Sequence, residues 1–345
     1  MPKTPDEQLL NLKTPEYRKA YSDRTAWLMA CISELVYIRF EPLIKGGFDE
    51  KRIIERLDEM LKNPKTEKML KALRHVCYDH EENLQNLISE LSALKFEIRE
   101  TFDSKGTQAM LVSNGSMLVL AFRGTEPDRV KDIKSDLDGV QEDCSTSGSI
   151  HRGFSNAYEV ISSRVVKELS KPEYSSLPLY ITGHSLGGAI ATVATKRLKH
   201  QGGHAATYTF GAPRVGNEDW VATIKTPVYR IVNSADIVPM LPPSGMTIDT
   251  IGWLTKLIPV YGDGISKWLL DNFSGYMHGG NMRFLSNCKT GKFSDVKLLY
   301  SVHFWRRVRA LAHRLSPLSK LASDHSMSIY RRKLNVIARR RNNID

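Results

Sequence analysis

Cysteine is scarce in this sequence, and the spacing of the cysteines argues against a zinc site and against a disulfide framework. The chain of 345 residues has no CxxC pair and no cluster of cysteine with histidine. Zinc sites and disulfide frameworks both need cysteines at close or regular spacings. We therefore expect no metal site and no disulfide framework, but reduced, structural thiols. The four cysteines are Cys31, Cys77, Cys144 and Cys288.

Long hydrophobic runs are also missing. The most apolar stretch, 26–38, contains Glu34 and is shorter than the roughly 20 residues that a membrane-spanning helix needs. The N-terminus begins MPKTPDEQLLNLKTPEYRK, which lacks the apolar core and the small-residue cleavage site of a signal peptide. We therefore expect no transmembrane segment, and a protein that is cytoplasmic or is exported without a Sec signal peptide.

Acidic residues are scarce at the C-terminus. Residues 301–345 hold eleven lysines and arginines against Asp324 and Asp345, a net charge of +9 out of the formal +11 of the whole chain. Such a segment favours contact with an anionic membrane surface, where each basic residue contributes about 1 kcal/mol, but it is also typical of a solvated helix face. We expect no nucleic-acid partner, because the segment carries no recognisable nucleic-acid motif.

Two kinds of hydrophobic pattern divide the chain near residue 95. Apolar residues recur with helical spacing in 24–40, 49–62 and 81–95, which predicts an N-terminal helical segment over residues 1–95. From residue 96 onward, strand-like runs alternate with helical patterns, which predicts a mostly parallel sheet covered on both faces. The strand-like runs are 95–103, 107–113, 116–122, 177–183, 204–211, 227–233 and 276–285, and the helical patterns are 154–170, 187–200, 295–315 and 326–341.

One serine stands between glycines at a junction of strand and helix. Ser185 is the central residue of the pentapeptide GHSLG. The apolar run LPLYIT precedes this turn, and the helical pattern GGAIATVATKRL follows it. Gly183 and Gly187 remove side chains where a sharp turn would make strand and helix collide, as in a nucleophile elbow. A plain glycine turn is the alternative interpretation. Ser185 is the candidate nucleophile, and the backbone N–H of Leu186, at the helix N-terminus, is a candidate oxyanion donor.

A serine nucleophile needs a base, and the base needs an orienting acid. In α/β-hydrolases the acid and then the histidine follow the serine along the chain. Asp236 lies directly after the strand-like run 227–233, where such an acid is expected, and a turn or capping role is the alternative. The other downstream aspartates lie in a helical stretch or in an insertion: Asp219, Asp249, Asp263 and Asp271.

Five segments then stand in order along the chain: LAFRGTE (120–126), IHRGFSNAY (150–158), ITGHSLGGA (181–189), FGAPRVGN (210–217) and RIVNSADIVPMLPP (230–243). Together they resemble the signature segments of the class 3 lipases, an α/β-hydrolase family that includes triacylglycerol lipases of filamentous fungi and many bacterial members. The resemblance implies an α/β-hydrolase domain over residues 96–345. Residues 1–95 match that core poorly, but 23–37 is similar to the leading helix of bacterial members, so we expect a bacterial-type member.

The resemblance also implies the base and a second oxyanion donor. His325, in SDHSMSIYRRKL, resembles the family's histidine in a loop at the start of the final helix, from which it can reach Ser185. Thr125 stands at the family's oxyanion position, and Gly124 before it would let the backbone approach the substrate. The alternative bases are His278, in the strand-like run 276–285, His303 and His313. Structural roles are expected for His151 and for His184 of the elbow.

Residues 244–275 form an expected insertion between the acid and the histidine. Amphipathic patterns around Trp253 and Trp268 predict either an interfacial flap or acyl-binding cap, or a helical excursion packed on the core. Fungal members of the family carry a lid soon after the oxyanion residue. The corresponding stretch here, 126–139, is short and charged, which argues against interfacial activation by a lid.

These residues predict a serine hydrolase, a lipase or carboxylesterase that cleaves acyl esters of lipids without a metal or organic cofactor. The triad acts on the ester and not on the head group, so triacylglycerols and phospholipids remain alternative substrates. A phospholipase A-type effector or toxin is therefore one alternative. From another class, a noncatalytic membrane- or nucleic-acid-binding protein that uses its basic C-terminus is the second.

Overall fold

The computed structural model describes eight stretches of the chain, which hold the sheet and the helices that cover it. The expected insertion at 244–275 lies outside them apart from Gly275, and so do the charged stretch 126–139 and the helical pattern 49–62. The described residues are 4–12, 15–40, 80–124, 141–144, 147–242, 275–288, 293–303 and 324–344.

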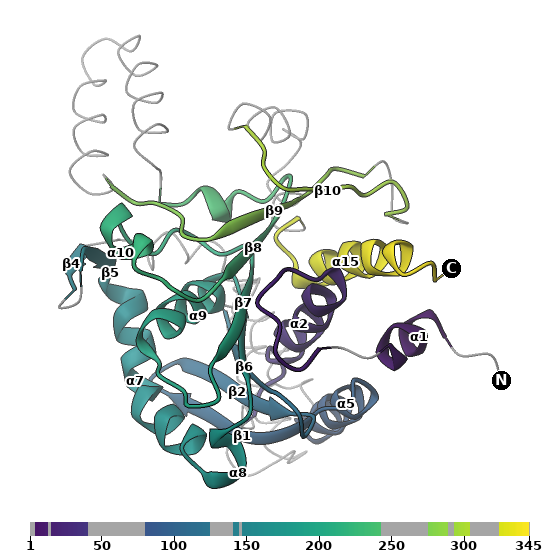
Figure 1. The fold of residues 1–345 in the computed structure, drawn as a ribbon, viewed down its shortest axis with the longest axis horizontal. Helices are drawn as coiled ribbons and strands as arrows, with labels where there is room; N and C mark the ends of the chain where they lie inside the picture. The colour runs from purple at the N-terminus through teal and green to yellow at the C-terminus, as the bar shows by residue number, and fades with distance from the viewer. Residues whose placement is uncertain are drawn as a thin grey trace, which may run out of the picture.

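The strands form one mixed sheet with a parallel centre (Figure 1). Their order is β1-β2-β3-β6-β7-β8-β9-β10, and the four pairs from β3 to β9 are parallel, whereas the outer pairs are antiparallel. The carboxyl ends of the five parallel strands therefore meet at one edge. The bounds are β1 Glu97–Ser104, β2 Thr107–Ser113, β3 Leu118–Phe122, β6 Leu179–His184, β7 His204–Phe210, β8 Val228–Asn233, β9 Asn281–Leu285 and β10 Leu298–Leu299. A separate ribbon pairs β4 Gln141–Asp143 with β5 Ser149–His151.

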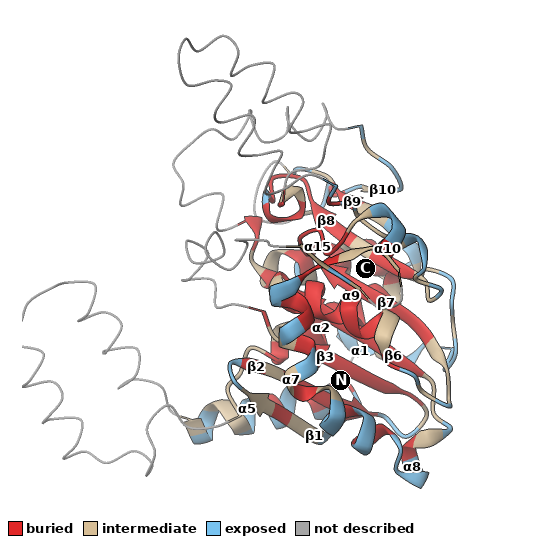
Figure 2. Ribbon diagram, turned by 90° about the vertical axis from the view of Figure 1, so that its left-hand side faces the viewer, coloured by how far each residue is buried: buried red, intermediate tan, exposed pale blue. Residues whose placement is uncertain are grey.

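Helices cover both faces of this sheet, as the alternation of strands and helices predicts. In β3, Val119 and Ala121 belong to the core with α2 and α15, whereas Leu120 and Phe122 belong to the core with α7 and α9. Figure 2 shows the resulting buried layer, which runs through β3, α2 and α9. No described helix combines the length and apolar content of a membrane span. The main helices are α1 Pro5–Asn11, α2 Asp23–Leu35, α5 His80–Ala93, α7 Arg152–Leu169, α9 Leu186–Arg197 and α15 Met327–Arg341.

The N-terminal helix α2 and the C-terminal helix α15 lie side by side on one face of the sheet (Figure 1). Arg331 of α15 pairs with Glu34 of α2 at 3.0 Å, and Arg341 pairs with Asp23 at 2.7 Å. The Ser22 hydroxyl caps the start of α2 by accepting the backbone N–H of Thr25 at 3.3 Å. Residues of α2, α15 and the sheet belong to one hydrophobic core, so α2 and α15 pack against each other and against the sheet.

Two predicted elements differ from the structure. The predicted helix over 295–315 is wrong at its start, because Leu298–Leu299 pair with β9 as the edge strand β10. The predicted strand over 276–285 begins only at Asn281, since Gly280 has a φ of 82°, a conformation that a strand does not use. His278 therefore precedes β9 and does not lie in it. Three short helices complete the described elements: α8 Pro172–Ser175, α10 Glu218–Ala222 and the 3-10 helix η2 Val238–Met240.

Candidate active site

Ser185 occupies the sharp turn between β6 and α9. Its φ of 56° and ψ of −127° lie outside the regions that residues with a side chain favour, as expected for the strained turn of a nucleophile elbow. A Cβ on Gly183 would collide with the Gly187 carbonyl oxygen, and a Cβ on Gly187 would collide with that of Phe122. The backbone N–H of Ser185 donates to the Phe210 carbonyl at 2.9 Å, which fixes the turn to the end of β7.

The structure brings Ser185, Asp236 and His325 together at the carboxyl ends of the strands. Ser185 follows β6, Asp236 lies in the loop after β8, and His325 lies just before α15. The Ser185 hydroxyl donates to His325 Nε2 at 2.8 Å, and His325 Nδ1 donates to Asp236 Oδ2 at 2.8 Å. All three residues are at most 4% exposed. The arrangement can serve as a nucleophile, a general base and an orienting acid.

Two further donors hold the Asp236 carboxylate. The Tyr330 hydroxyl donates to Oδ2 at 2.6 Å, and the backbone N–H of Val238 donates to Oδ1 at 2.9 Å. Gly211, with a φ of 57°, leaves the room that the carboxylate needs: a Cβ there would lie 2.6 Å from Asp236 Oδ2 and 3.1 Å from His325 Nδ1. The acid is thus fixed by residues of η2, α15 and the end of β7, and the sequence reasoning identified none of them.

His184, the last residue of β6, holds the backbone of His325. Its Nε2 donates to the His325 carbonyl oxygen at 2.7 Å, and its Nδ1 accepts from the Tyr37 hydroxyl at 2.8 Å. Burial, together with the nearby His325 ring, lowers the pKa of His184 well below its usual value, so the imidazole is neutral at pH 7. A neutral ring has one donor and one acceptor nitrogen, which matches these two partners.

A buried polar network joins α15 to the loop that carries the base. Lys333, only 2% exposed, donates from Nζ to Asn233 Oδ1 at 2.7 Å and to the Ser286 carbonyl at 2.8 Å. Asn233 Nδ2 donates in turn to the Asp324 carbonyl at 2.8 Å, and Asp324 directly precedes His325. These bonds offset the cost of burying the ammonium group. The position of the loop that carries His325 therefore depends on Lys333, which the sequence pattern grouped with the basic residues of the C-terminus.

One of the two expected oxyanion donors lies beside the serine. Leu186 is the first residue of α9, where a backbone N–H has no acceptor within the helix and the helix dipole favours negative charge. Thr125 lies outside the described residues. A Cβ on the preceding Gly124 would lie 3.3 Å from Ser185 Cβ and would collide with the Tyr37 hydroxyl. The segment that leads to Thr125 therefore passes directly beside Ser185.

The alternative bases occupy other positions. His278 donates from Nε2 to the Pro239 carbonyl at 2.6 Å, His303 is exposed, and His313 lies outside the described residues. His151 is buried and stacks on Phe154, with 4.0 Å between the ring centroids. Of the alternative acids, Asp219 lies in α10, and Asp249, Asp263 and Asp271 lie outside the described residues. Within the described stretches, no cluster of three or more histidine, cysteine or carboxylate side chains could hold a metal ion.

A mostly parallel sheet with helices on both faces, and a serine on a strained strand–helix turn, define an α/β-hydrolase. The fold is similar to that of a lipase from Rhizopus microsporus var. chinensis, with a TM-score of 0.52 at 19% identity over 91% of this chain and 89% of that one. Residues 119–246 match the family model described as Lipase (class 3).

Two relatives of known class show the extent of the match. A secreted mono- and diacylglycerol lipase of Fusarium solani is 38% identical over 99 residues, which are 27% of this chain and 30% of the relative. A lipase of Rhizomucor miehei is 31% identical over 170 residues, 44% of this chain and 46% of the relative. The chain thus spans less than half the length of either relative.

Proposed function

We propose that this protein is a serine carboxylic-ester hydrolase that cleaves acyl esters of lipids. The observation that carries the proposal is the hydrogen-bonded series from the Ser185 hydroxyl through His325 to Asp236, placed on a strained elbow. A serine hydroxyl becomes a useful nucleophile when an adjacent, oriented base can take its proton. The family match and the names of the relatives support lipid esters as the substrate class.

In this mechanism Ser185 Oγ attacks the ester carbonyl carbon while His325 Nε2 takes the hydroxyl proton. Asp236 stabilises the imidazolium, and the backbone N–H groups of Leu186 and Thr125 hold the new oxyanion. The carbon–oxygen bond to the alcohol then breaks, and His325 returns the proton to the departing alcohol. A water molecule, deprotonated by His325, hydrolyses the acyl-enzyme and restores the serine hydroxyl.

Neutral glycerides are the substrates that we propose ahead of phospholipids. The name of the Fusarium solani relative specifies mono- and diacylglycerols, and contact with an anionic lipid surface is expected only from the basic C-terminus. Of the six basic residues in α15, Arg331 and Arg341 form ion pairs with α2, Lys333 is buried, and Arg340 donates to backbone carbonyls. Four of the six basic side chains of α15 therefore stabilise contacts within the protein. Membrane contact through α15, a phospholipase A activity and the expected cellular location stay predictions.

The function is tested by assaying purified protein side by side on p-nitrophenyl esters, triacylglycerol emulsions and phospholipid vesicles. We expect hydrolysis of the soluble ester and of the emulsion. A Ser185→Ala variant should lose turnover by a factor on the order of 10⁶, and His325→Ala by a similar factor, because triad members act as a unit. Inactivity of the folded protein on all three substrates would contradict the proposal and favour a noncatalytic role.

A further inference from the structure

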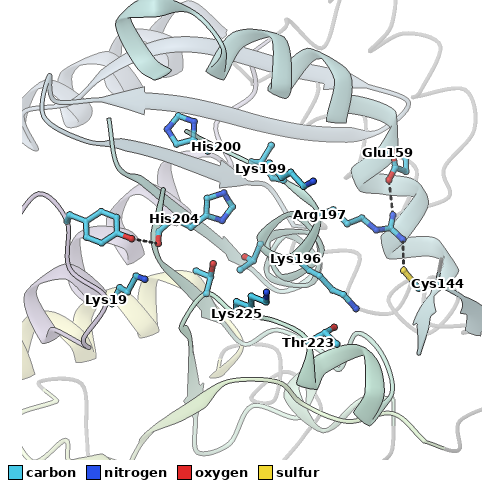
Figure 3. Close-up of a pocket in the computed structure, with 14 residues that line it drawn as sticks. Lys19, Cys144, Glu159, Lys196, Arg197, Lys199, His200, His204, Thr223 and Lys225 are labelled. Atoms are coloured by element: carbon cyan, nitrogen blue, oxygen red, sulfur yellow. Dashed lines mark hydrogen bonds and ion pairs between the residues drawn. The ribbon is translucent and has the colours of Figure 1, made fainter. Parts of the chain in front are cut away.

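A basic cavity opens at the amino end of β7. Ser185 lies at the other end of the parallel strands, where their carboxyl ends meet. The volume of the cavity is about 890 Å³, and its walls come from the end of α9, the start of β7, the loop before β8 and the segment before α2. Figure 3 shows cationic side chains on several sides of this space. Five lysines and arginines line it against one carboxylate: Lys19, Lys196, Arg197, Lys199 and Lys225 against Glu159.

The length of β7 separates this cavity from the candidate active site. His204, the first residue of β7, lines the cavity, whereas Phe210, the last residue, accepts the backbone N–H of Ser185. Seven strand residues at roughly 3.3 Å each span about 20 Å. The cavity therefore does not belong to the acyl site and needs an explanation of its own.

The fold itself explains two of the five cations. Lys196 Nζ donates to the Trp220 carbonyl at 3.0 Å and lies 4.4 Å from the centroid of the Trp220 ring. Arg197 pairs with Glu159 at 2.8 Å. Both residues lie in the last turn of α9, where the helix dipole favours positive charge. Lys196 and Arg197 would therefore be placed here without any ligand.

The other three cations have weaker contacts within the described chain: Lys19 Nζ lies 5.8 Å from the centroid of the Tyr17 ring, and Lys199 and Lys225 form no ion pair. Lys19, Lys199 and Lys225 are exposed, come from three separate segments, and have no carboxylate partner among the residues that the structure describes. Like charges that converge on one space repel one another unless an anion neutralises them. His204 also lines the cavity, and its Nε2 is buried with no hydrogen-bond partner in the described part of the chain.

We propose that this cavity binds a compound that carries two or more phosphate groups. Lysines bind phosphate as flexible point charges, and lysines from three segments suit several phosphate groups better than one. The volume falls in the range of small-molecule sites, roughly 300–1,000 Å³. Tyr17 is the only tyrosine, phenylalanine or tryptophan among the described lining residues, and Lys19 Nζ lies 5.8 Å from the centroid of its ring. A phosphorylated polyol and a lipid head group that carries phosphates both present the chemistry that the lysines recognise.

Isothermal titration calorimetry of the full chain with inorganic tripolyphosphate tests the site. We expect saturable one-to-one binding that weakens at least about tenfold in the double variant Lys199→Gln/Lys225→Gln, since bonds between charged groups are lost. The control variant Lys105→Gln/Lys167→Gln removes the same charge from exposed residues outside the cavity and should bind as the unmodified protein does. Thermal unfolding, recorded in parallel, shows that each variant is folded.

Vesicles distinguish a head group from a soluble ligand. Ether-linked phosphatidylcholine, with and without ether-linked phosphatidylinositol bisphosphate, offers several phosphates on one head group without a cleavable acyl ester. Retention by the bisphosphate vesicles that tripolyphosphate reverses assigns the cavity to a head group, whereas tripolyphosphate binding without retention assigns it to a soluble phosphate compound. The proposal is overturned if neither probe binds, or if the cavity variant and the control variant bind tripolyphosphate equally well.

Discussion

The Tyr330 hydroxyl donates a 2.6 Å hydrogen bond to Oδ2 of Asp236, the same oxygen that accepts from His325 Nδ1. The same hydroxyl accepts the backbone N–H of Asn233 at 2.9 Å, so one side chain of α15 ties the last residue of β8 to the candidate acid. Tyr330 is fully buried. The geometry of the acid therefore depends on the docking of α15 as well as on the loop that carries Asp236.

We predict that Tyr330→Phe lowers kcat on a soluble ester about tenfold and changes KM little. The substitution removes one hydrogen bond to the acid, worth roughly 1–1.5 kcal/mol, without opening a cavity. Steady-state kinetics with p-nitrophenyl butyrate measures the effect. Tyr300→Phe is the control, because Tyr300 is 56% exposed. Equal kinetics in the two variants would show that Tyr330 does not position the acid.

We predict that Gly211→Ala strongly lowers kcat on a soluble ester while the protein remains folded. The added Cβ would lie 2.6 Å from Asp236 Oδ2 and would displace the carboxylate from His325. Gly106→Ala is the matched control, because Gly106 also has a positive φ, of 84°, but faces open space. Both variants place a side chain at positive φ, which costs roughly 1–2 kcal/mol, so the free energy of unfolding in urea should fall in both, and further in Gly211→Ala because of the contact with Asp236 Oδ2. Full activity of folded Gly211→Ala would be incompatible with the observed packing.

We predict that Lys333→Met lowers the free energy of unfolding by about 1–3 kcal/mol. Methionine fills a similar volume, but it removes the charged donor from the Asn233 side-chain oxygen, which keeps the Ser234 N–H, and from the Ser286 carbonyl, which keeps the weak Cys288 thiol donor. Arg332→Met on the same helix is the control, since Arg332 is exposed and its loss should stay within about 0.5 kcal/mol. Urea denaturation measures both values, and equal values would refute a structural role for the buried ammonium.

We predict that the free energy of unfolding falls as the pH drops from 7 to 5. Burial lowers the pKa of His204 to about 4 and that of His184 well below its usual value. An unfolded histidine titrates near 6.5, so the unfolded state binds protons that the folded state excludes. The stabilisation from the neutral rings is complete above about pH 6.5 and is lost as the pH falls toward the folded values. His204→Gln should flatten this decline in urea denaturation, and an unchanged decline would contradict the burial of a neutral ring.

Local sequence patterns predicted the sheet and its strand–helix junctions because those elements depend on nearby residues. The elbow shows this well, since its glycines, the strand before it and the helix after it are contiguous. The structure also places the candidate acid and base beside Ser185, at the positions that the chain order and the family resemblance gave. Their catalytic roles, and that of Thr125, stay predictions.

The supporting residues depend on contacts that local patterns do not carry. Lys333 lies in a run of basic residues that is typical of a solvated helix face, yet the docking of α15 buries it. Tyr37 acts on His184 across nearly 150 positions of the chain. The edge strand β10 was predicted as helix because its pairing partner, β9, decides its conformation.

The central claim is that Ser185 is the nucleophile, and labelling by a fluorophosphonate probe tests it most directly. The probe phosphonylates a serine only where a base activates the hydroxyl, and mass spectrometry of the intact protein and of its peptides locates the adduct. We predict one adduct on Ser185, none in folded Ser185→Ala, and strongly slowed labelling in His325→Ala. An adduct on another residue, or equal labelling of the unmodified protein and Ser185→Ala, would contradict the claim.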